Sequence, residues 1–291
     1  MKELAINMLP FKEKIGKAIV SKYIDKPIFV VGCGRSGTTA LGNAIGMHPN
    51  IRSTAIEAPL INHFAGVFQH YCCCDVADYV QNATQIRGDE LRERIKKDMY
   101  EVVWGEYYGL RSAIREYLQS FGNQIYDRWL VKAFPNEREW DGLRGLFPEA
   151  KFVYIYRNGI DVVNSMTKFG WFSKQSFKKL CEFWVRHMNR YSYLEDGGRA
   201  VVIRYEHFLN DPEAVLKKIY GYMDYEMENG SLEYAQTRIV HPLDKPDING
   251  SPKDIITKRQ PAYLSWSNEQ KNVFKKVAGE MMERYQYDMP Y

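Results

Sequence analysis

A glycine-rich loop near the start of the chain has the composition of a phosphate-binding site. It occupies residues 32–39 (GCGRSGTT) and follows the apolar run at residues 27–31 (PIFVV). The β-branched run predicts a strand, and the residues after the loop predict a helix. Backbone N–H groups and a helix N-terminus at such a strand–loop–helix junction bind phosphate. The loop therefore predicts a site for a phosphorylated ligand.

One position of the loop departs from the consensus of nucleoside triphosphatases, G-x-x-x-x-G-K-[ST]. Gly32 and Gly37 have the required spacing, but Thr38 replaces the Lys, and the nearby cation is Arg35, inside the loop. In nucleoside triphosphatases that Lys contacts the β- and γ-phosphates, and the next Ser or Thr binds Mg²⁺. The substitution disfavours a nucleotide kinase or another P-loop phosphotransferase. That class and a non-catalytic nucleotide-binding protein stay open as alternatives.

A second pair of residues able to bind an anion follows a later apolar run. Residues 151–156 (KFVYIY) predict a strand that leads into Arg157, and the helix predicted after it contains Ser165. A cation at the carboxyl end of a strand and a hydroxyl in the next helix can converge on one ligand, because open parallel sheets bind ligands at that edge. The alternative is that Arg157 forms a surface ion pair with Asp161.

Together the two motifs resemble those of the sulfotransferases that use 3′-phosphoadenosine 5′-phosphosulfate (PAPS). In that family the R-[DN]-x-x-[DE]-x-x-x-S motif binds the 3′-phosphate, and Arg157 and Ser165 match it residue for residue. A loop of the form [KR]-[ST]-G-T-[ST] binds the 5′-phosphosulfate. This loop is matched by Arg35, Ser36, Gly37, Thr38 and Thr39. The resemblance implies a PAPS-dependent sulfotransferase that releases adenosine 3′,5′-bisphosphate.

Three further residues occur in segments that follow the family's order. Lys132, at the end of a predicted strand, would reach the sulfuryl group, although a Lys at a strand end is also a common surface residue. Tyr205, in an Arg-Tyr-Glu sequence, would contact the adenine ring. Lys258 would be the cation of a C-terminal lid over the nucleotide, with Lys253 and Arg259 as alternatives.

The resemblance, which covers about residues 27–275, also indicates a general base. In the branch that sulfates phenols and steroids, a His lies two residues after the Lys of a K-T-H sequence, and Phe134 occupies that position here. Another branch, which includes tyrosylprotein and many bacterial enzymes, uses a Glu in an H-P-x-[IV]…E-x-P pattern that this chain resembles. Glu57 is therefore the candidate base, with His63 and His70 as alternatives.

The chemistry implied by the resemblance is an in-line displacement, in which the protein stabilises charge and takes up a proton. Arg35 and the loop amides would stabilise the leaving 5′-phosphate, and Glu57 would remove the proton of the acceptor. Because a sulfuryl group carries less charge than a γ-phosphate, no metal is expected.

The acceptor is expected to be a hydroxyl of a small molecule. Trp171 and Phe172 follow the helix that contains Ser165 and could line its pocket, with His63 as a further candidate, although an aromatic pair at a helix end is often part of the core. A tyrosine hydroxyl, a carbohydrate hydroxyl and an amine are alternative acceptors.

The predicted fold is α/β, with a parallel sheet flanked by helices around the strand–loop–helix phosphate site. Asp211 and Ser267 are the expected N-caps of two of the helices. Strands are predicted at residues 28–31, 129–131, 151–156 and 200–205. Helices are predicted at residues 39–47, 89–121, 137–146, 159–167, 176–193, 212–222 and 268–285.

The chain is expected to form a single domain over residues 1–291. Residues 1–26 have Lys at intervals among apolar residues, which predicts an amphipathic surface helix. Residues 54–88 have no clean helical or strand period, and residues 229–262 are polar and interrupted by Pro and Gly. Both stretches are predicted to be insertions that bind the acceptor and form the lid.

The composition excludes several classes of protein. The net charge is +4 and the pI is about 8.6, so nucleic acid is not an expected partner. The 5 Cys residues include the run Cys72, Cys73 and Cys74 but no C-x-x-C pair, so neither a disulfide framework nor a zinc site is expected. No apolar run approaches the roughly 20 residues of a membrane span, and no signal peptide is recognisable, so a cytoplasmic protein is expected.

Overall fold

The computed structural model describes residues 25–57, 59–72, 77–96, 126–237 and 261–291. These residues fall into two compact units. The first consists of the described residues up to 29 and those between 46 and 151, and the second of residues 30–45 and the described residues from 152 onward. The predicted N-terminal helix and the lid residue Lys258 lie outside the described residues. The single-domain assignment stays a prediction.

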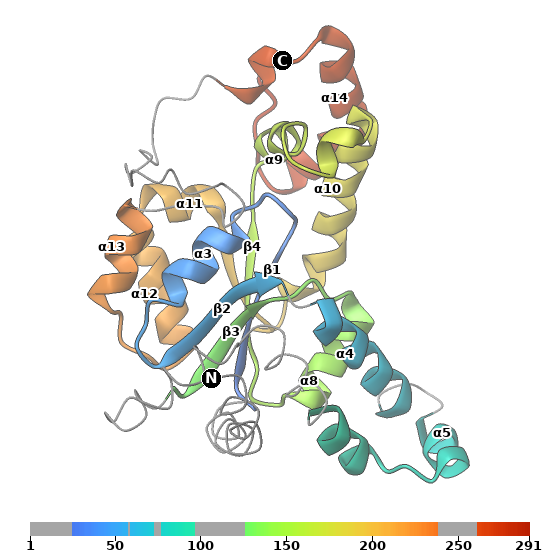
Figure 1. The fold of residues 1–291 in the computed structure, drawn as a ribbon. Coiled ribbons are helices and arrows are strands. Elements are labelled where there is room, and N and C mark those ends of the chain that lie inside the picture. Colours follow the sequence, from blue (N-terminus) through green and yellow to red (C-terminus); the bar gives the residue numbers. More distant parts are fainter. Residues whose placement is uncertain (1–24, 58, 73–76, 97–125, 238–260) are drawn as a thin grey trace, which may run out of the picture. The chain divides into compact units, whose positions relative to one another are not determined.

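Five parallel strands form one sheet in the described part of the chain, in the order β2-β3-β1-β4-β5 (Figure 1). The predicted α/β fold class is therefore confirmed, and four strands lie where the apolar runs predicted them. The strands are β1 (Pro27–Gly32), β2 (Ile51–Glu57), β3 (Arg128–Lys132), β4 (Lys151–Tyr156) and β5 (Val201–Arg204).

Strand β2 is the one that the sequence pattern did not reveal. Its residues, IRSTAIE, mix polar and apolar side chains, and it ends the strand order, with β3 as its neighbour. A strand at the edge of a sheet is less enclosed than a central one, so it needs no continuous apolar run. The register with β3 shifts between Ser53 and Glu57, after which Glu57 and Lys132 are Cα partners.

In the first unit, helix α4 (Pro59–Cys72) packs against α8 (Glu137–Leu146). Their close approach requires glycine at position 142, because a Cβ there would lie 2.0 Å from the backbone oxygen of Ala65. The unit also contains α5 (Ala77–Thr84) and a helical segment at residues 88–96. The stretch 54–88, in which the sequence showed no clean period, therefore contains helices α4 and α5 and the end of a strand.

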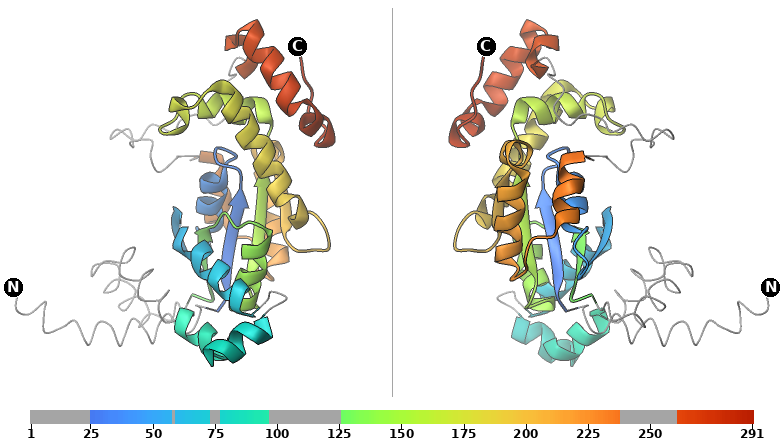
Figure 2. Two further views of the ribbon diagram at one scale, coloured as in Figure 1. Left: turned by 90° about the vertical axis from the view of Figure 1, so that its right-hand side faces the viewer. Right: turned by 90° about the vertical axis from the view of Figure 1, so that its left-hand side faces the viewer.

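In the second unit, α14 packs along α10, and α9 also contacts α10 (Figure 2). Helix α13 packs against α3, which follows the glycine-rich loop. None of the helices in the described ranges is long and apolar enough to cross a membrane. The helices of this unit are α3 (Thr38–Ile45), α9 (Gly159–Met166), α10 (Phe177–Tyr191), α11 (Tyr205–Asn210), α12 (Pro212–Tyr222), α13 (Asn229–Thr237) and α14 (Asn268–Arg284).

The predicted helix starts are confirmed where capping residues marked them. The Asp211 side chain accepts a hydrogen bond from the Ala214 N–H at 2.9 Å and caps α12, and the Ser267 hydroxyl accepts one from the Gln270 N–H at 3.2 Å and caps α14. Helices α11 and α13 were not predicted. In particular, Tyr205 begins α11, whereas the strand prediction extended to it.

The core of each unit is rich in aromatic rings. In the first unit, the rings of Phe29, Trp129 and Phe147 lie with centroids 6.0–6.2 Å apart in pairs. In the second, Trp184 and Phe274 are fully buried and stack with centroids 6.3 Å apart. Part of the aromatic content of the chain, which is 14%, therefore serves packing.

His187, on α10, lies among aromatic rings. Its ring centroid is 3.9 Å from that of Phe183 and 6.0 Å from that of Tyr191, and its Nδ1 lies 2.8 Å from the backbone oxygen of Phe183. Burial, helped by the charges of Arg190 and Arg186, lowers the pKa of His187 from 6.5 to about 4. The residue is therefore neutral at pH 7 and packs, partly buried, among these rings.

We predict that His187 makes folding less stable as the pH falls from 6.5 toward 4. In this window the unfolded chain, with the ordinary pKa of 6.5, binds a proton that the folded chain does not bind. The stability is fully present above pH 6.5 and falls by about 2 kcal/mol between pH 7.5 and pH 5. Denaturant unfolding of the wild type and of His187→Phe, which keeps a ring and removes the titration, measures this loss. An equal loss in both proteins would contradict the assignment.

Candidate functional site

The loop between β1 and α3 turns at two residues with positive φ. Arg35 has a φ of 71° and Gly37 a φ of 95°. The Ser36 N–H donates to the backbone oxygen of Cys33 at 3.1 Å, and the Leu41 N–H donates to that of Gly37 at 3.0 Å. A side chain at position 37 would place its Cβ 2.5 Å from the ring of Tyr205, so this position requires glycine for both its φ and its packing.

The first turn of α3 has the groups that bind an anion. N–H groups in the first turn of a helix, here that of Thr38 among them, have no acceptor within the helix. These N–H groups and the helix dipole favour negative charge in front of the helix. Ser36 is fully buried, and its Oγ has no hydrogen-bond partner among the residues that the structure describes. A ligand oxygen that reached this hydroxyl would remove the cost of leaving it unpaired.

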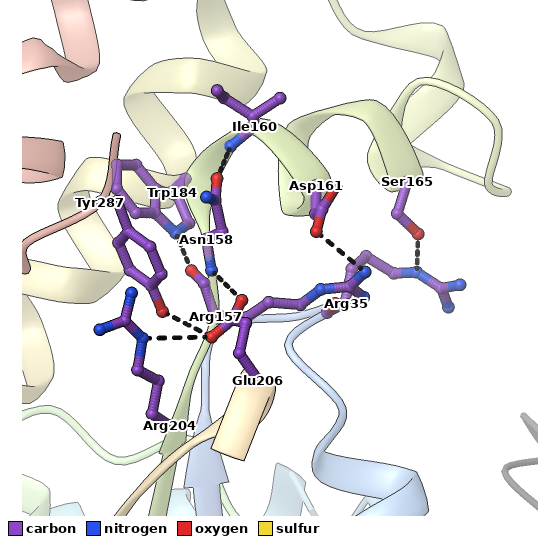
Figure 3. Close-up of polar contacts among 10 residues, drawn as sticks. All are labelled: Arg35, Arg157, Asn158, Ile160, Asp161, Ser165, Trp184, Arg204, Glu206 and Tyr287. Carbon is purple, nitrogen blue, oxygen red and sulfur yellow. Dashed lines mark hydrogen bonds and ion pairs between the residues drawn. The ribbon is translucent and has the colours of Figure 1, made fainter. Parts of the chain in front are cut away.

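Arg157 lies at the end of β4, and its guanidinium faces the loop (Figure 3). Its Nη1 donates to the backbone oxygen of Arg35 at 3.4 Å, and its ζ-carbon lies 4.3 Å from the ring centroid of Tyr205. The alternative ion pair does form, with Nη2 3.5 Å from Oδ2 of Asp161, but the Arg157 side chain is only 19% exposed. Its Nε is buried and lacks a hydrogen-bond partner within the described ranges, which leaves a donor for a ligand.

Ser165, on α9, faces Arg35 (Figure 3). The Arg35 Nε donates to the Ser165 Oγ at 3.0 Å, although the two residues are 130 positions apart in the sequence. The Arg35 guanidinium also lies over the ring of Phe169, 3.9 Å from its centroid. Because a hydroxyl that accepts one hydrogen bond can still donate its own hydrogen, Ser165 can contact Arg35 and an anion at once.

The peptide group that follows Arg157 is held at both of its polar atoms. The Arg157 backbone oxygen accepts a hydrogen bond from Nε1 of Trp184 at 3.3 Å, and the Asn158 N–H donates to Oε1 of Glu206 at 3.0 Å. The Asn158 side chain also accepts a hydrogen bond from the Ile160 N–H at 2.8 Å and caps α9. The strand end is thus fixed on both sides.

Glu206 joins this strand end to the last residues of the chain (Figure 3). Its Oε2 accepts a hydrogen bond from the Tyr287 hydroxyl at 2.9 Å and lies 3.5 Å from Nε of Arg204. Neither Glu206 nor Tyr287 was predicted from the sequence to be a residue of the site. Glu206 could have been predicted as a site residue, because it follows Tyr205 within the Arg-Tyr-Glu sequence. Tyr287 lies 81 positions from Glu206, and no sequence motif marks it.

The two aromatic candidates for the acceptor pocket differ in exposure. Phe172 packs beside the loop, where a Cβ at Gly34 would lie 3.3 Å from its ring, and its centroid is 5.2 Å from that of Phe183. Trp171 is 61% exposed and meets Phe172 edge-on at 5.2 Å. Phe172 is therefore a packing residue of the loop, and Trp171 presents its ring to solvent.

The arrangement in the second unit suits a ligand with two anionic groups. The loop and the start of α3 offer amides and the Ser36 hydroxyl to one group, and Arg157 and Ser165 offer donors to another. Ser36 Oγ and Arg157 Nε are buried and have no hydrogen-bond partner among the described residues, and these two atoms favour such a ligand. In the described part of the chain, no group of three or more His, Cys, Asp or Glu residues could hold a metal ion.

Glu57 and Lys132 belong to the first unit. Glu57 is the last residue of β2 and Lys132 the last residue of β3, and the two are Cα partners. Lys132 is buried, with 5% exposure, so it is not the surface residue of the alternative interpretation. His63 and His70 lie at exposed positions of α4.

Comparison with known proteins gives a family match and one curated relative. The model of the sulfotransferase family matches residues 27–229, which is more than half of the chain. An uncharacterized protein of Aquifex aeolicus (strain VF5) is 24% identical over 279 residues, which cover 90% of this chain and 34% of that protein. The chain therefore spans about a third of the length of that relative.

Several solved structures are similar at low sequence identity. The sulfotransferase domain of the Synechococcus PCC 7002 olefin synthase has a TM-score of 0.49 and 15% identity, covering 91% of this chain and 96% of that one. The sulfotransferase domain from the curacin biosynthetic pathway has a TM-score of 0.48 and 16% identity, covering 90% and 98%. Mouse sulfotransferase SULT7A1, complexed with PAP, has a TM-score of 0.47 and 14% identity, covering 94% and 90%.

Proposed function

The chain belongs to the sulfotransferase family, and we propose that it transfers the sulfuryl group of PAPS to a hydroxyl of a small-molecule acceptor. The observation that supports this function best is the grouping of Arg35, Arg157 and Ser165 around the glycine-rich loop. A triphosphate with Mg²⁺ needs the Lys that Thr38 replaces. A nucleotide with a 3′-phosphate and a 5′-phosphosulfate instead needs two sets of hydrogen-bond donors. Membership of the sulfotransferase family disfavours the nucleotide kinase alternative.

In this proposal each end of PAPS has its own residues. The loop amides and the side chains of Ser36, Thr38 and Thr39 bind the 5′-phosphosulfate, together with Arg35. Arg157 and Ser165 bind the 3′-phosphate, and the hydrogen bond between Arg35 and Ser165 links the two ends. The adenine contact of Tyr205 and the lid role of Lys258 stay predictions.

The proposed reaction is a single displacement at sulfur. The acceptor oxygen forms a bond to sulfur as the bond from sulfur to the 5′-phosphate oxygen breaks, and that oxygen takes the electron pair. Arg35 and the loop amides stabilise the charge that develops on the phosphate, where preorganised donors have their largest effect. The products are the sulfated acceptor and adenosine 3′,5′-bisphosphate, and no metal ion is required by this scheme.

We assign the proton transfer to Glu57, which places the chain in the Glu-base branch of the family. Glu57 ends β2 as the Cα partner of Lys132, and residues at the carboxyl ends of parallel strands commonly serve ligand sites. Glu57 would take the proton of the acceptor hydroxyl. Lys132, buried at the end of β3, would stabilise the sulfuryl oxygens.

The acceptor is the least constrained part of the proposal. The exposed ring of Trp171, beside Phe172 and the loop, supports an acceptor with an apolar or aromatic body. His63 and His70 are at exposed positions of α4 and remain the alternative bases. The cytoplasmic location stays a prediction.

Removing the guanidinium of Arg157 should remove the preference for a 3′-phosphate. We predict that Arg157→Ala weakens binding of adenosine 3′,5′-bisphosphate by about 100-fold, because a charge-assisted pair is lost. Binding of adenosine 5′-monophosphate should change little. Isothermal titration of the full chain with both nucleotides measures the two affinities.

The matched control is Arg190→Ala, which removes an exposed arginine of α10 and should leave both affinities unchanged. Thermal unfolding of each variant reports whether the fold is intact. If folded Arg157→Ala bound the bisphosphate as tightly as the wild type, the 3′-phosphate assignment would be wrong.

Replacing the carboxylate of Glu57 should impair chemistry and spare nucleotide binding. We predict that Glu57→Gln lowers kcat by about 10²- to 10⁴-fold, because the amide cannot accept the proton. Its affinity for adenosine 3′,5′-bisphosphate should equal that of the wild type. Turnover is measured with labelled PAPS and a simple phenol or alcohol that the wild type accepts.

His63→Ala provides the comparison for this measurement. Near-normal turnover by Glu57→Gln, together with a large loss in His63→Ala, would transfer the role of base to His63.

A further inference from the structure

We propose that Glu206 and Tyr287 are positioning residues that direct Arg157 toward the 3′-phosphate. Neither residue needs to touch the nucleotide. They act on the peptide group between Arg157 and Asn158, and the last described segment of the chain thereby contributes to nucleotide selectivity. This role rests on the proposed function, because it requires a ligand with a 3′-phosphate.

The peptide group between Arg157 and Asn158 is hydrogen-bonded on both sides. The carbonyl of Arg157 and the N–H of Asn158 lie in one rigid plane and point in opposite directions. Trp184 donates to the carbonyl at 3.3 Å, and Glu206 accepts from the N–H at 3.0 Å. Two bonds on opposite sides of one plane prevent its rotation. Because this plane sets the backbone torsion next to Arg157, they also fix the direction in which the Arg157 side chain leaves the strand.

Both carboxylate oxygens of Glu206 accept hydrogen bonds. Its Oε1 bonds to the peptide N–H, and its Oε2 accepts the Tyr287 hydroxyl at 2.9 Å. The Arg204 guanidinium, with Nε 3.5 Å from Oε2, compensates the carboxylate charge. A carboxylate bound at both oxygens cannot turn about its terminal torsion, so it keeps Oε1 aligned with the Asn158 N–H.

Tyr287 lies just after the end of α14 and is buried. The residue is only 7% exposed, and its ring lies 6.4 Å from that of Tyr156 and 4.1 Å from the Arg204 ζ-carbon. Burial and the neighbouring Glu206 raise the pKa of Tyr287, so the hydroxyl stays protonated and donates. A fixed donor at this position keeps the Glu206 carboxylate in place.

The test compares two nucleotides that differ only in the 3′-phosphate. Tyr287→Phe removes the hydroxyl and keeps the ring, so we expect about tenfold weaker binding of adenosine 3′,5′-bisphosphate. Binding of adenosine 5′-monophosphate should stay within twofold of the wild type. Glu206→Gln should show the same selective loss. A merely structural role would weaken both nucleotides equally, so the ratio of the two affinities decides between the roles.

Tyr291→Phe is the matched control on the same segment. The Tyr291 hydroxyl is buried and has no hydrogen-bond partner in the part of the chain that the structure describes, so its removal should leave the ratio unchanged. A second control is a double mutant. In an Arg157→Ala background, Tyr287→Phe should have no further effect on the ratio, because the residue that it positions is gone.

The outcomes separate this inference from the proposed function. If wild-type protein binds both nucleotides equally, the proposed function fails and the positioning role fails with it. If the wild type prefers the bisphosphate and folded Tyr287→Phe retains the full preference, only the positioning role is overturned. The positioning role is also overturned if Tyr287→Phe reduces the ratio of the two affinities equally in the wild type and in the Arg157→Ala background. Should Glu206→Gln fail to fold, Tyr287→Phe alone decides.

Discussion

Two guanidinium groups share one partly buried site, and the surrounding residues are arranged around their like charges. Arg35 and Arg157 come from the loop after β1 and the end of β4, and the Arg157 guanidinium bonds to the Arg35 backbone. The nearby carboxylate of Asp161 is 44% exposed and neutralises only part of this charge. The faces of two aromatic rings, Phe169 and Tyr205, hold the guanidinium planes at 3.9 and 4.3 Å. The remaining positive field, reinforced by the α3 N-terminus, favours an anionic ligand.

This arrangement also explains why the loop differs from that of a nucleoside triphosphatase. The Arg35 guanidinium, bonded to Ser165, is tied to the residues around Arg157 rather than extended along a row of phosphates. A site with its cations divided between two positions matches a nucleotide phosphorylated at two separate hydroxyls. In the proposed reaction, charge stabilisation by fixed donors would suffice for transfer of a sulfuryl group.

The sequence predicted the parts of the molecule whose signals are local. The loop, Arg157 and Ser165 belong to short motifs, and the central strands are continuous apolar runs. Strand β2 was missed because the polar residues Arg52 and Ser53 interrupt its apolar pattern. Helices α4 and α5, in the stretch 54–88, were not predicted either.

The residues that support the site could not be predicted from short sequence motifs. Trp184 donates to the Arg157 carbonyl from 27 positions away, and Tyr287 donates to Glu206 from 81 positions away. No local pattern around either residue marks these contacts. Only folding places an indole N–H on one side of the peptide and a carboxylate on the other. Such residues become visible when every buried backbone group is assigned a partner.

The central claim is that the site recognises a nucleotide by its 3′-phosphate and 5′-phosphate together. Thermal unfolding of the full wild-type chain, titrated in parallel with adenosine 3′,5′-bisphosphate, adenosine 5′-monophosphate and ATP with Mg²⁺, tests it most directly. A ligand that binds only the folded state raises the free energy of unfolding, by about 2.7 kcal/mol at 100 times its Kd. We expect the largest rise in Tm with the bisphosphate. A larger rise with ATP and Mg²⁺, or equal rises with the bisphosphate and the monophosphate, would contradict it.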